Sequence, residues 1–186
     1  MNIPNILTSL RLLLIPVIVV VHYLPFTGTN GLAAGIFLVA SFTDWFDGYL
    51  ARRLNQTTPF GAFLDPVADK VMVAVALVLL IEKFDTPIIT IPGMIIISRE
   101  IVISALREWM AELGKRTSVA VSFIGKLKTA SQMGSITLLL WAEHMNEGLV
   151  GISGLMMLQV AAVLTIWSMF IYLKAAWPDL NPFGKE

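Results

Sequence analysis

The sequence predicts an all-α integral membrane protein with six transmembrane helices and a polar cavity that faces the cytoplasm. The first observation is composition: 56% of the 186 residues are hydrophobic and only 14% are charged, as in polytopic membrane proteins. The second is six apolar runs that lack the period-two alternation of barrel strands, so helices are the structure a bilayer allows. The third is a set of basic residues gathered at one side of these runs.

Each apolar run is close to the ~20 residues that a membrane-spanning helix needs. The first run has no basic stretch before it and no small-residue cleavage site after it, so we interpret it as an uncleaved span rather than a signal peptide. We expect one membrane domain over residues 1–186, without a repeat or a separate soluble domain. The expected spans are Ile6–Leu24, Leu32–Ala51, Gly61–Ile81, Ile88–Trp109, Leu127–Trp141 and Ile152–Leu173.

The distribution of Lys and Arg predicts the orientation. If the N-terminus is cytoplasmic, the three outer loops hold only Lys83. Such an asymmetry agrees with the positive-inside rule. The basic residues at or near the cytoplasmic ends are then Arg11, Arg52, Arg53, Arg107, Lys115, Arg116, Lys126, Lys128, Lys174 and Lys185.

Four aspartates lie at the same cytoplasmic side, although a charge within a membrane costs roughly 2.5 to 3.5 kcal/mol on insertion scales. Asp44 and Asp47 share one helix face at i, i+3, and Asp65 and Asp69 share a face of the next helix at i, i+4. Four adjacent carboxylates repel one another, so we expect divalent cations, most simply two, to neutralise them. Oxygen ligands favour Mg²⁺ or Mn²⁺ over zinc.

Other residues near the aspartates suit a phosphate ligand. Gly48 and Gly61 leave room for a ligand or a neighbouring helix, and Arg52 offers a planar set of donors. The absence of cysteine excludes disulfides and thiol chemistry, and the net charge of zero gives no reason to expect a nucleic-acid partner.

Two alternatives stay open at this level. Paired acids on a helix usually form a solvated face, and acids within a membrane also occur in cation or proton transporters. A transporter, however, is expected to spread its acids through the membrane depth, whereas these four lie at one level beside basic residues.

The string from Asp44 to Asp69, D-x2-D-G-x2-A-R-x8-G-x3-D-x3-D, resembles the signature of the CDP-alcohol phosphotransferases at every position. Further segments are similar to the bacterial members that use glycerol phosphate, so the resemblance covers nearly the full chain. These segments are Asn2–Arg11, Thr43–Arg53, Leu64–Lys70, Arg99–Arg107 and Gly125–Thr129.

The resemblance implies an enzyme of the bacterial inner (cytoplasmic) membrane with its active site on the cytoplasmic side. It implies transfer of the phosphatidyl group of CDP-diacylglycerol to sn-glycerol 3-phosphate, which gives phosphatidylglycerophosphate and CMP. We expect membrane lipids around the protein and a homodimer. A sister enzyme with another acceptor, such as serine, inositol or phosphatidylglycerol, stays an alternative because the signature reports the CDP half of the chemistry.

By resemblance, Asp44, Asp47, Asp65 and Asp69 bind two divalent ions, and Asp69 is the catalytic base for the acceptor hydroxyl. The implied CDP site consists of Asn5, Thr8, Gly48, Ala51, Arg52 and Gly61. An alternative for Asn5 and Thr8 is that they cap the start of the first helix.

The acceptor carries an anionic phosphate and needs cations of its own. Arg107, Lys126 and Lys128 are candidates, and Arg99 lies about two turns deeper on the same helix as Arg107. The alternatives are that the first three anchor anionic head groups, and that Arg99 is paired with Glu100 or Glu108.

Overall fold

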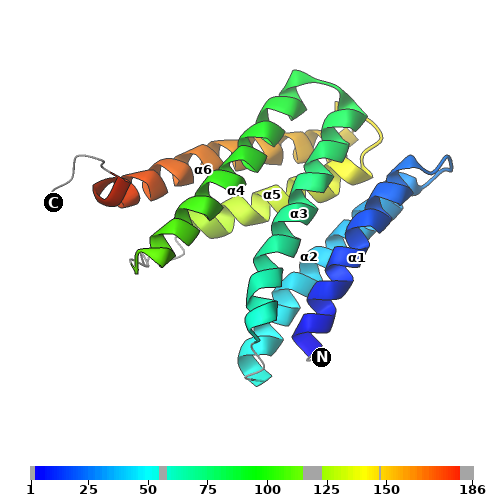
Figure 1. Cartoon of the computed structure of the whole chain (residues 1–186). Helices are drawn as coiled ribbons and strands as arrows, with labels where there is room; N and C mark the ends of the chain where they lie inside the picture. Colours follow the sequence, from blue (N-terminus) through cyan, green and yellow to red (C-terminus); the bar gives the residue numbers. More distant parts are fainter. Residues whose placement is uncertain (1–2, 55–57, 115–122, 147, 181–186) are drawn as a thin grey trace.

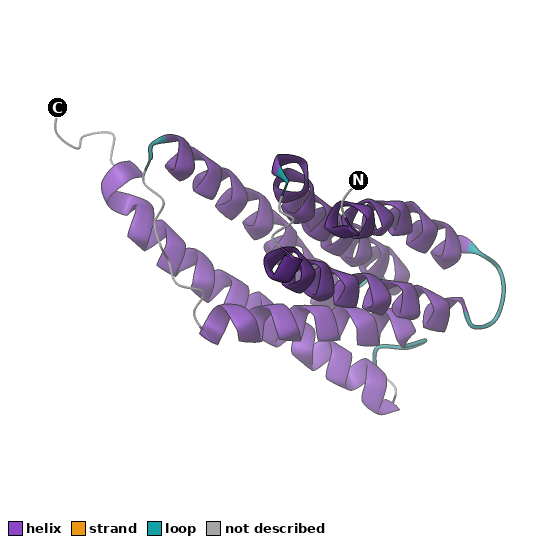
Figure 2. Ribbon diagram, turned by 90° about the horizontal axis from the view of Figure 1, so that it is seen from below, coloured by secondary structure: helices purple, strands orange, loops and turns teal. Residues whose placement is uncertain are grey.

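The computed structural model consists of six helices joined by short connections (Figure 1). It describes residues 3–54, 58–114, 123–146 and 148–180, and none of these residues forms a strand (Figure 2). The helices are α1 (Ile3–Tyr23), α2 (Thr29–Leu54), α3 (Pro59–Phe84), α4 (Pro87–Glu112), α5 (Phe123–Trp141) and α6 (Gly148–Leu180). Each predicted span corresponds to one of these helices, most of which extend it by a few residues, so the six predicted helices are confirmed as helices.

The helix ends follow from local sequence signals. Thr58 caps α3 by accepting a hydrogen bond from the Gly61 amide (3.0 Å), and Pro59 occupies the first turn, where no amide is needed. The same helix ends at Asp85, whose left-handed backbone (φ 42°) stops the helix. Pro87 then starts α4 two residues later.

The helices form a closed ring of contacts in the order α1, α2, α5, α6, α4 and α3. The most extensive pairing is between α5 and α6, followed by α1 and α2. Fully buried apolar side chains fill the centre, among them Phe37 of α2, Leu77 of α3, Ile96 of α4, Ile136 of α5 and Leu158 of α6. The ring therefore has one shared core, and the connections alternate between its two ends. We call the end with the α1–α2, α3–α4 and α5–α6 connections the outer end, and the other the inner end.

The outside of the bundle is strongly apolar. Leu13, Phe42, Leu149 and Trp177 are each more than 60% exposed, and many other large hydrophobic side chains lie on the surface with them. Of the described helices, α4 and α6 are long and apolar enough to cross a membrane on length and composition alone. An apolar exterior of this extent indicates a surface that meets lipid or another chain rather than water.

Lys83 fastens the outer end. Its Nζ donates to the carbonyls of Leu140 (3.0 Å) and Ala142 (2.7 Å) at the end of α5, and to Asn30 Oδ1 (2.9 Å) on α2. Burial lowers the pKa of Lys83 to about 8, and the nearby Glu143 acts against this shift. A helix leaves its last carbonyls unbonded, so this lysine satisfies the end of α5 and ties three helices together.

Candidate active site

The two halves of the aspartate motif lie on the last turns of α2 and the first turns of α3, at the inner end. The backbone of α2 is helical throughout the first half, which ends at Arg52. Asp65 and Asp69 follow each other by one turn on α3, as predicted, and both are partly exposed. The side-chain environments of the other predicted residues lie outside the described residues; these are Asn5, Asp44, Asp47, Gly48, Ala51 and Arg52.

Thr8 and Asp65 are brought together by the packing of α1 against α3. The Thr8 hydroxyl is fully buried and donates to Asp65 Oδ1 (2.5 Å). The capping interpretation of Asn5 and Thr8 is wrong, because α1 already begins at Ile3 and both residues lie inside it. Arg11, three residues after Thr8 and therefore on the same face of α1, is only 1% exposed. The sequence assigned it to orientation alone, yet it is a buried cation on the face that meets α3.

Gly61 lies at the start of α3, one turn before Asp65. It is buried, and its amide is held by the Thr58 cap, which fixes the first turn of the helix that carries both described aspartates.

A second polar group, which we call the Glu100 cluster, consists of Arg99, Glu100 and Lys128. Oε1 of Glu100 on α4 accepts from Lys128 Nζ on α5 and from Arg99 Nη1 (3.2 Å). Both cations are at least nine-tenths buried as side chains, whereas the Glu100 side chain is 24% exposed. The pairing of Arg99 with Glu100 was one sequence-based alternative, and the structure confirms it.

Helix α6 completes the surroundings of Arg99. Its Nη2 donates to Ser168 Oγ (3.2 Å), and its guanidinium carbon lies 5.4 Å from the centre of the Tyr172 ring. Its buried Nε has no hydrogen-bond partner among the described residues. Sequence reasoning missed Ser168 and Tyr172, although their i, i+4 spacing on an apolar helix places them on one face.

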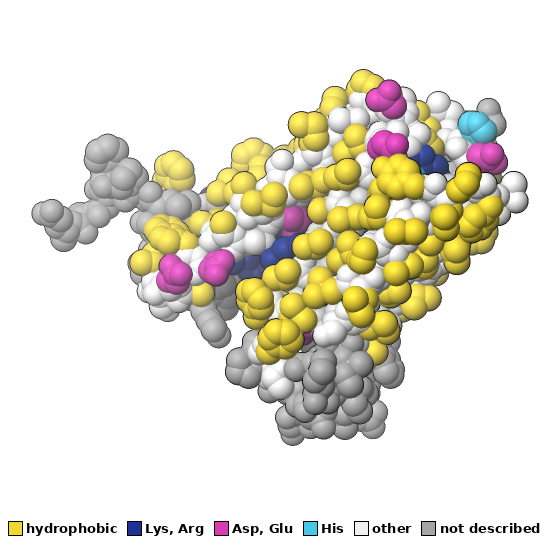
Figure 3. Space-filling view, turned by 45° about the vertical axis from the view of Figure 1, so that its right-hand side comes forward, with side chains coloured by type: hydrophobic (Ala, Val, Ile, Leu, Met, Phe, Trp, Pro, Cys, Tyr) yellow, Lys and Arg dark blue, Asp and Glu magenta, His cyan; other side chains and the backbone are white. Residues whose placement is uncertain are grey.

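The Glu100 cluster is coupled to the aspartate helix. Two residues of α3 interact electrostatically with the cluster: Asp69 attracts Lys128, and Lys70 attracts Glu100. A cavity of about 230 Å³ lies between α3 and α4, with Lys70 and Glu100 among its lining residues. In Figure 3, basic and acidic side chains gather in a hollow whose flanks are mostly hydrophobic. The structure therefore places Asp69 of the predicted acidic set within electrostatic reach of Lys128 of the predicted basic set.

Arg107 and Lys126 differ from the two buried cations of the Glu100 cluster. Both side chains are exposed at the inner end, and neither forms an ion pair within the part of the chain that the structure describes. Of the four residues predicted for the acceptor phosphate, the structure thus joins Arg99 and Lys128 through Glu100 and leaves the other two on the rim.

Comparison with known proteins identifies the family. The model of the CDP-alcohol phosphatidyltransferase family matches residues 1–171. The chain belongs to this family. It is 59% identical over 180 residues to a Yersinia pestis (strain Pestoides F) protein named CDP-diacylglycerol–glycerol-3-phosphate 3-phosphatidyltransferase, with 97% of each chain covered. A protein of the same name from Salmonella choleraesuis (strain SC-B67) is 58% identical over 179 residues, covering 96% of this chain and 97% of that one.

Membership in a family of membrane-associated transferases, together with the apolar helices α4 and α6, indicates that this chain is a transferase located in a membrane. Enzymes of this family generally depend on a divalent metal. Among the described residues, no three acidic, histidine or cysteine side chains are placed so that they could hold a metal ion; the side chains of Asp44 and Asp47 are not among those described. The chemistry of Asp65 fits a metal ligand, because Thr8 occupies only one of its lone pairs and oxygen is the donor that hard cations prefer.

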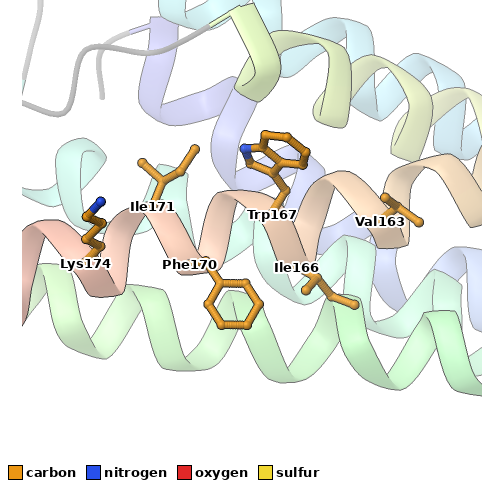
Figure 4. A pocket seen from close by; sticks show the side chains of 6 residues that line it. All are labelled: Val163, Ile166, Trp167, Phe170, Ile171 and Lys174. Atoms are coloured by element: carbon orange, nitrogen blue, oxygen red, sulfur yellow. The ribbon is translucent and has the colours of Figure 1, made fainter.

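A further hollow in the described part of the chain runs along α6 and has a volume of about 430 Å³. Trp167 and Ile171 project to one side of the helix and Phe170 to the other, with Lys174 at one end (Figure 4). Apart from Lys174 its lining is apolar, so it has the composition of a lipid-facing surface rather than of a site for a phosphate or a nucleotide.

Proposed function

We propose that the protein transfers the phosphatidyl group of CDP-diacylglycerol to sn-glycerol 3-phosphate, in anionic phospholipid biosynthesis. The observation that carries the proposal is the identity of 59% with a relative of that name over 97% of both chains. The pairing of two buried cations at the inner end supports an acceptor that carries a phosphate. Family membership also decides against the cation transporter.

In the proposed reaction, Asp69 accepts the proton of a glycerol hydroxyl. The hydroxyl oxygen attacks the phosphorus that bears diacylglycerol, the bond from this phosphorus to the bridging oxygen breaks, and CMP leaves with that oxygen. Two Mg²⁺ or Mn²⁺ ions held by Asp44, Asp47, Asp65 and Asp69 would neutralise the diphosphate and the leaving group. Asp69 is a candidate base because it lies one helical turn from the proposed metal ligand Asp65 and is partly exposed.

We assign binding of the cytidine diphosphate part of the donor to six residues other than the metal-binding aspartates. Asn5, Thr8, Gly48, Ala51, Arg52 and Gly61 would line the CDP site. The hydrogen bond from Thr8 to Asp65 supports the assignment of Thr8, because it places this residue directly beside a proposed metal ligand. It also orients the carboxylate before any ion binds.

We assign binding of the acceptor phosphate to four cations, two of them buried and two exposed. Arg99 and Lys128 form the buried floor, where exclusion of water strengthens a charged hydrogen bond. Arg107 and Lys126 form the exposed rim, where they attract the anion at lower gain.

We further propose that residues 1–186 form one multi-pass domain in the bacterial inner membrane, with the inner end facing the cytoplasm and a homodimer as the assembly. The chain has no cysteine, so single cysteines report sidedness cleanly. A cysteine in place of Glu112 should be labelled from the cytoplasmic side only, and one in place of Asp85 from the outside only. The opposite pattern would refute the orientation.

The reaction itself is tested with purified protein by CMP release from CDP-diacylglycerol across a panel of acceptors. We expect turnover with glycerol 3-phosphate, little with glycerol, serine or inositol, and none in excess chelator until Mg²⁺ or Mn²⁺ is restored. Turnover with serine or inositol and none with glycerol 3-phosphate would assign the protein to a sister activity.

A further inference from the structure

Glu100 is the residue that connects the two buried cations of the acceptor site. One oxygen of its carboxylate accepts from both Lys128 on α5 and Arg99 on α4. A buried charge without a partner is strongly destabilising, so Lys128 and Arg99 need an anion when no substrate is present. Glu100 is the carboxylate that the structure gives them both.

The bonds to Glu100 leave donors free for a second anion. An ammonium has three N–H groups and a guanidinium has five. Arg99 uses Nη1 for Glu100 and Nη2 for Ser168, and its Nε–H is buried without a partner among the described residues. A buried N–H without an acceptor is uncommon and points to a ligand that is absent.

The charges also favour an anion. Arg99, Lys128 and the neighbouring Lys70 carry three positive charges, whereas Glu100 and Asp69, whose charge also acts on Lys128, carry two negative charges. The group is therefore net positive by about one charge, which favours an anion such as a phosphate monoester, itself roughly −1.5 to −2 at neutral pH.

We propose that Glu100 is a positioning residue for the acceptor: it holds Lys128 and Arg99 in the geometry that receives the phosphate of the attacking alcohol. This assignment rests on the proposed function. Glu100 stays paired while the phosphate binds to the remaining donors, so it acts through the two cations and does not touch the substrate.

The test compares Glu100→Gln with Glu108→Gln, an exposed glutamate on the same helix. For Glu100→Gln we expect KM for glycerol 3-phosphate to rise about tenfold, since misplaced binding groups weaken recognition steeply. Both kcat and KM for CDP-diacylglycerol should stay within about twofold of wild type, and Glu108→Gln should behave as wild type. A KM that is unchanged, or that falls because Glu100 competes with the phosphate, would overturn the assignment, as would equal rises for both substrates.

A double-mutant cycle tests the route of the effect. In a Lys128→Gln background, adding Glu100→Gln should raise KM for glycerol 3-phosphate by less than about threefold, because the cation it orients is gone. Losses that multiply would show that Glu100 does not act through Lys128.

Two controls keep the result interpretable. If Glu100→Gln does not fold, Glu100→Asp keeps the charge but shortens the side chain, and its KM for the acceptor should fall between wild type and the tenfold increase; an unchanged KM contradicts the proposal. Wild-type protein that does not use glycerol 3-phosphate would overturn the proposed function and this assignment with it, whereas wild-type turnover with an unaffected Glu100→Gln overturns only the assignment.

Discussion

The two ends of the bundle each hold a lysine that is at least half-buried, and the two lysines are bonded in different ways. At the outer end, Lys83 donates to backbone carbonyls of α5 and to Asn30, all of them neutral acceptors that use its available donors. At the inner end, Lys128 pairs with Glu100 beside Arg99, whose Nε–H has no hydrogen-bond partner in the described part of the chain. Lys83, whose N–H groups are all used by neutral acceptors, stabilises the fold. Lys128 and Arg99 keep N–H groups that can bind a further anion.

The largest expected difference between the two ends comes from removing one carboxylate on α3. Asp65→Asn should lower kcat/KM by more than about a hundredfold, because charge stabilisation by bound metal contributes several kcal/mol. Asp85→Asn is the matched control: it changes the same group at the outer end of the same helix, where asparagine also tolerates the left-handed backbone. CMP release measures both variants.

Near-normal turnover of Asp65→Asn would contradict the metal assignment, and so would full activity of the wild type in excess chelator. Loss of folded protein in Asp65→Asn, but not in Asp85→Asn, would instead make the Thr8 contact a structural one.

Lys128→Gln should produce the next largest effect. It removes a charge-assisted contact worth roughly 1.5 to 3 kcal/mol, or one to two decades in kcat/KM. The loss should fall on glycerol 3-phosphate, while CDP-diacylglycerol keeps nearly its wild-type KM, because the residues proposed to bind the donor lie on α1, α2 and α3. Equal losses for both substrates would make Lys128 a support of the fold and weaken the contrast with Lys83.

Lys83→Met should show the opposite pattern to Lys128→Gln. It leaves the carbonyls at the end of α5 without a donor, at a cost of about 1 to 3 kcal/mol of stability. Thermal unfolding in detergent should shift to lower temperature, while kcat/KM of the folded fraction stays at the wild-type value. The exposed Lys174→Met serves as a control. An activity defect at unchanged stability would contradict the structural role of Lys83.

The helices were predictable from the sequence because apolar length and turn residues are local signals. The same holds for the one-turn spacing of Asp65 and Asp69. The start of α1 was not predicted, because Pro4 suits the first turn of a helix as well as the loop before one, and the helix begins at Ile3. The capping interpretation of Thr8 failed for this reason.

The Glu100 cluster could not be predicted in full from the sequence, because most of its contacts join distant parts of the chain. Glu100 meets Lys128 across 28 positions, and Arg99 meets Ser168 across 69. Spacing along one helix fixes which residues share a face, but the neighbour of that face depends on the ring order of the helices. Arg99 and Glu100 adjoin in the sequence, so their pairing was expected, whereas the role of α6 was not.

The smallest expected effect is at the exposed rim. Lys126→Gln and Arg107→Gln remove cations that are solvated and unpaired among the described residues, and exposed charges typically contribute about 0.2 to 1 kcal/mol. We therefore expect kcat/KM for glycerol 3-phosphate to fall by less than about fivefold, with the loss shrinking further as salt is added. Steady-state kinetics at low and high ionic strength measures this. A loss as large as that of Lys128→Gln, and insensitive to salt, would mean that Arg107 and Lys126 are shielded from solvent once the acceptor binds. Burial in the free protein would then not distinguish cations that bind the acceptor from cations that anchor the protein to lipid head groups.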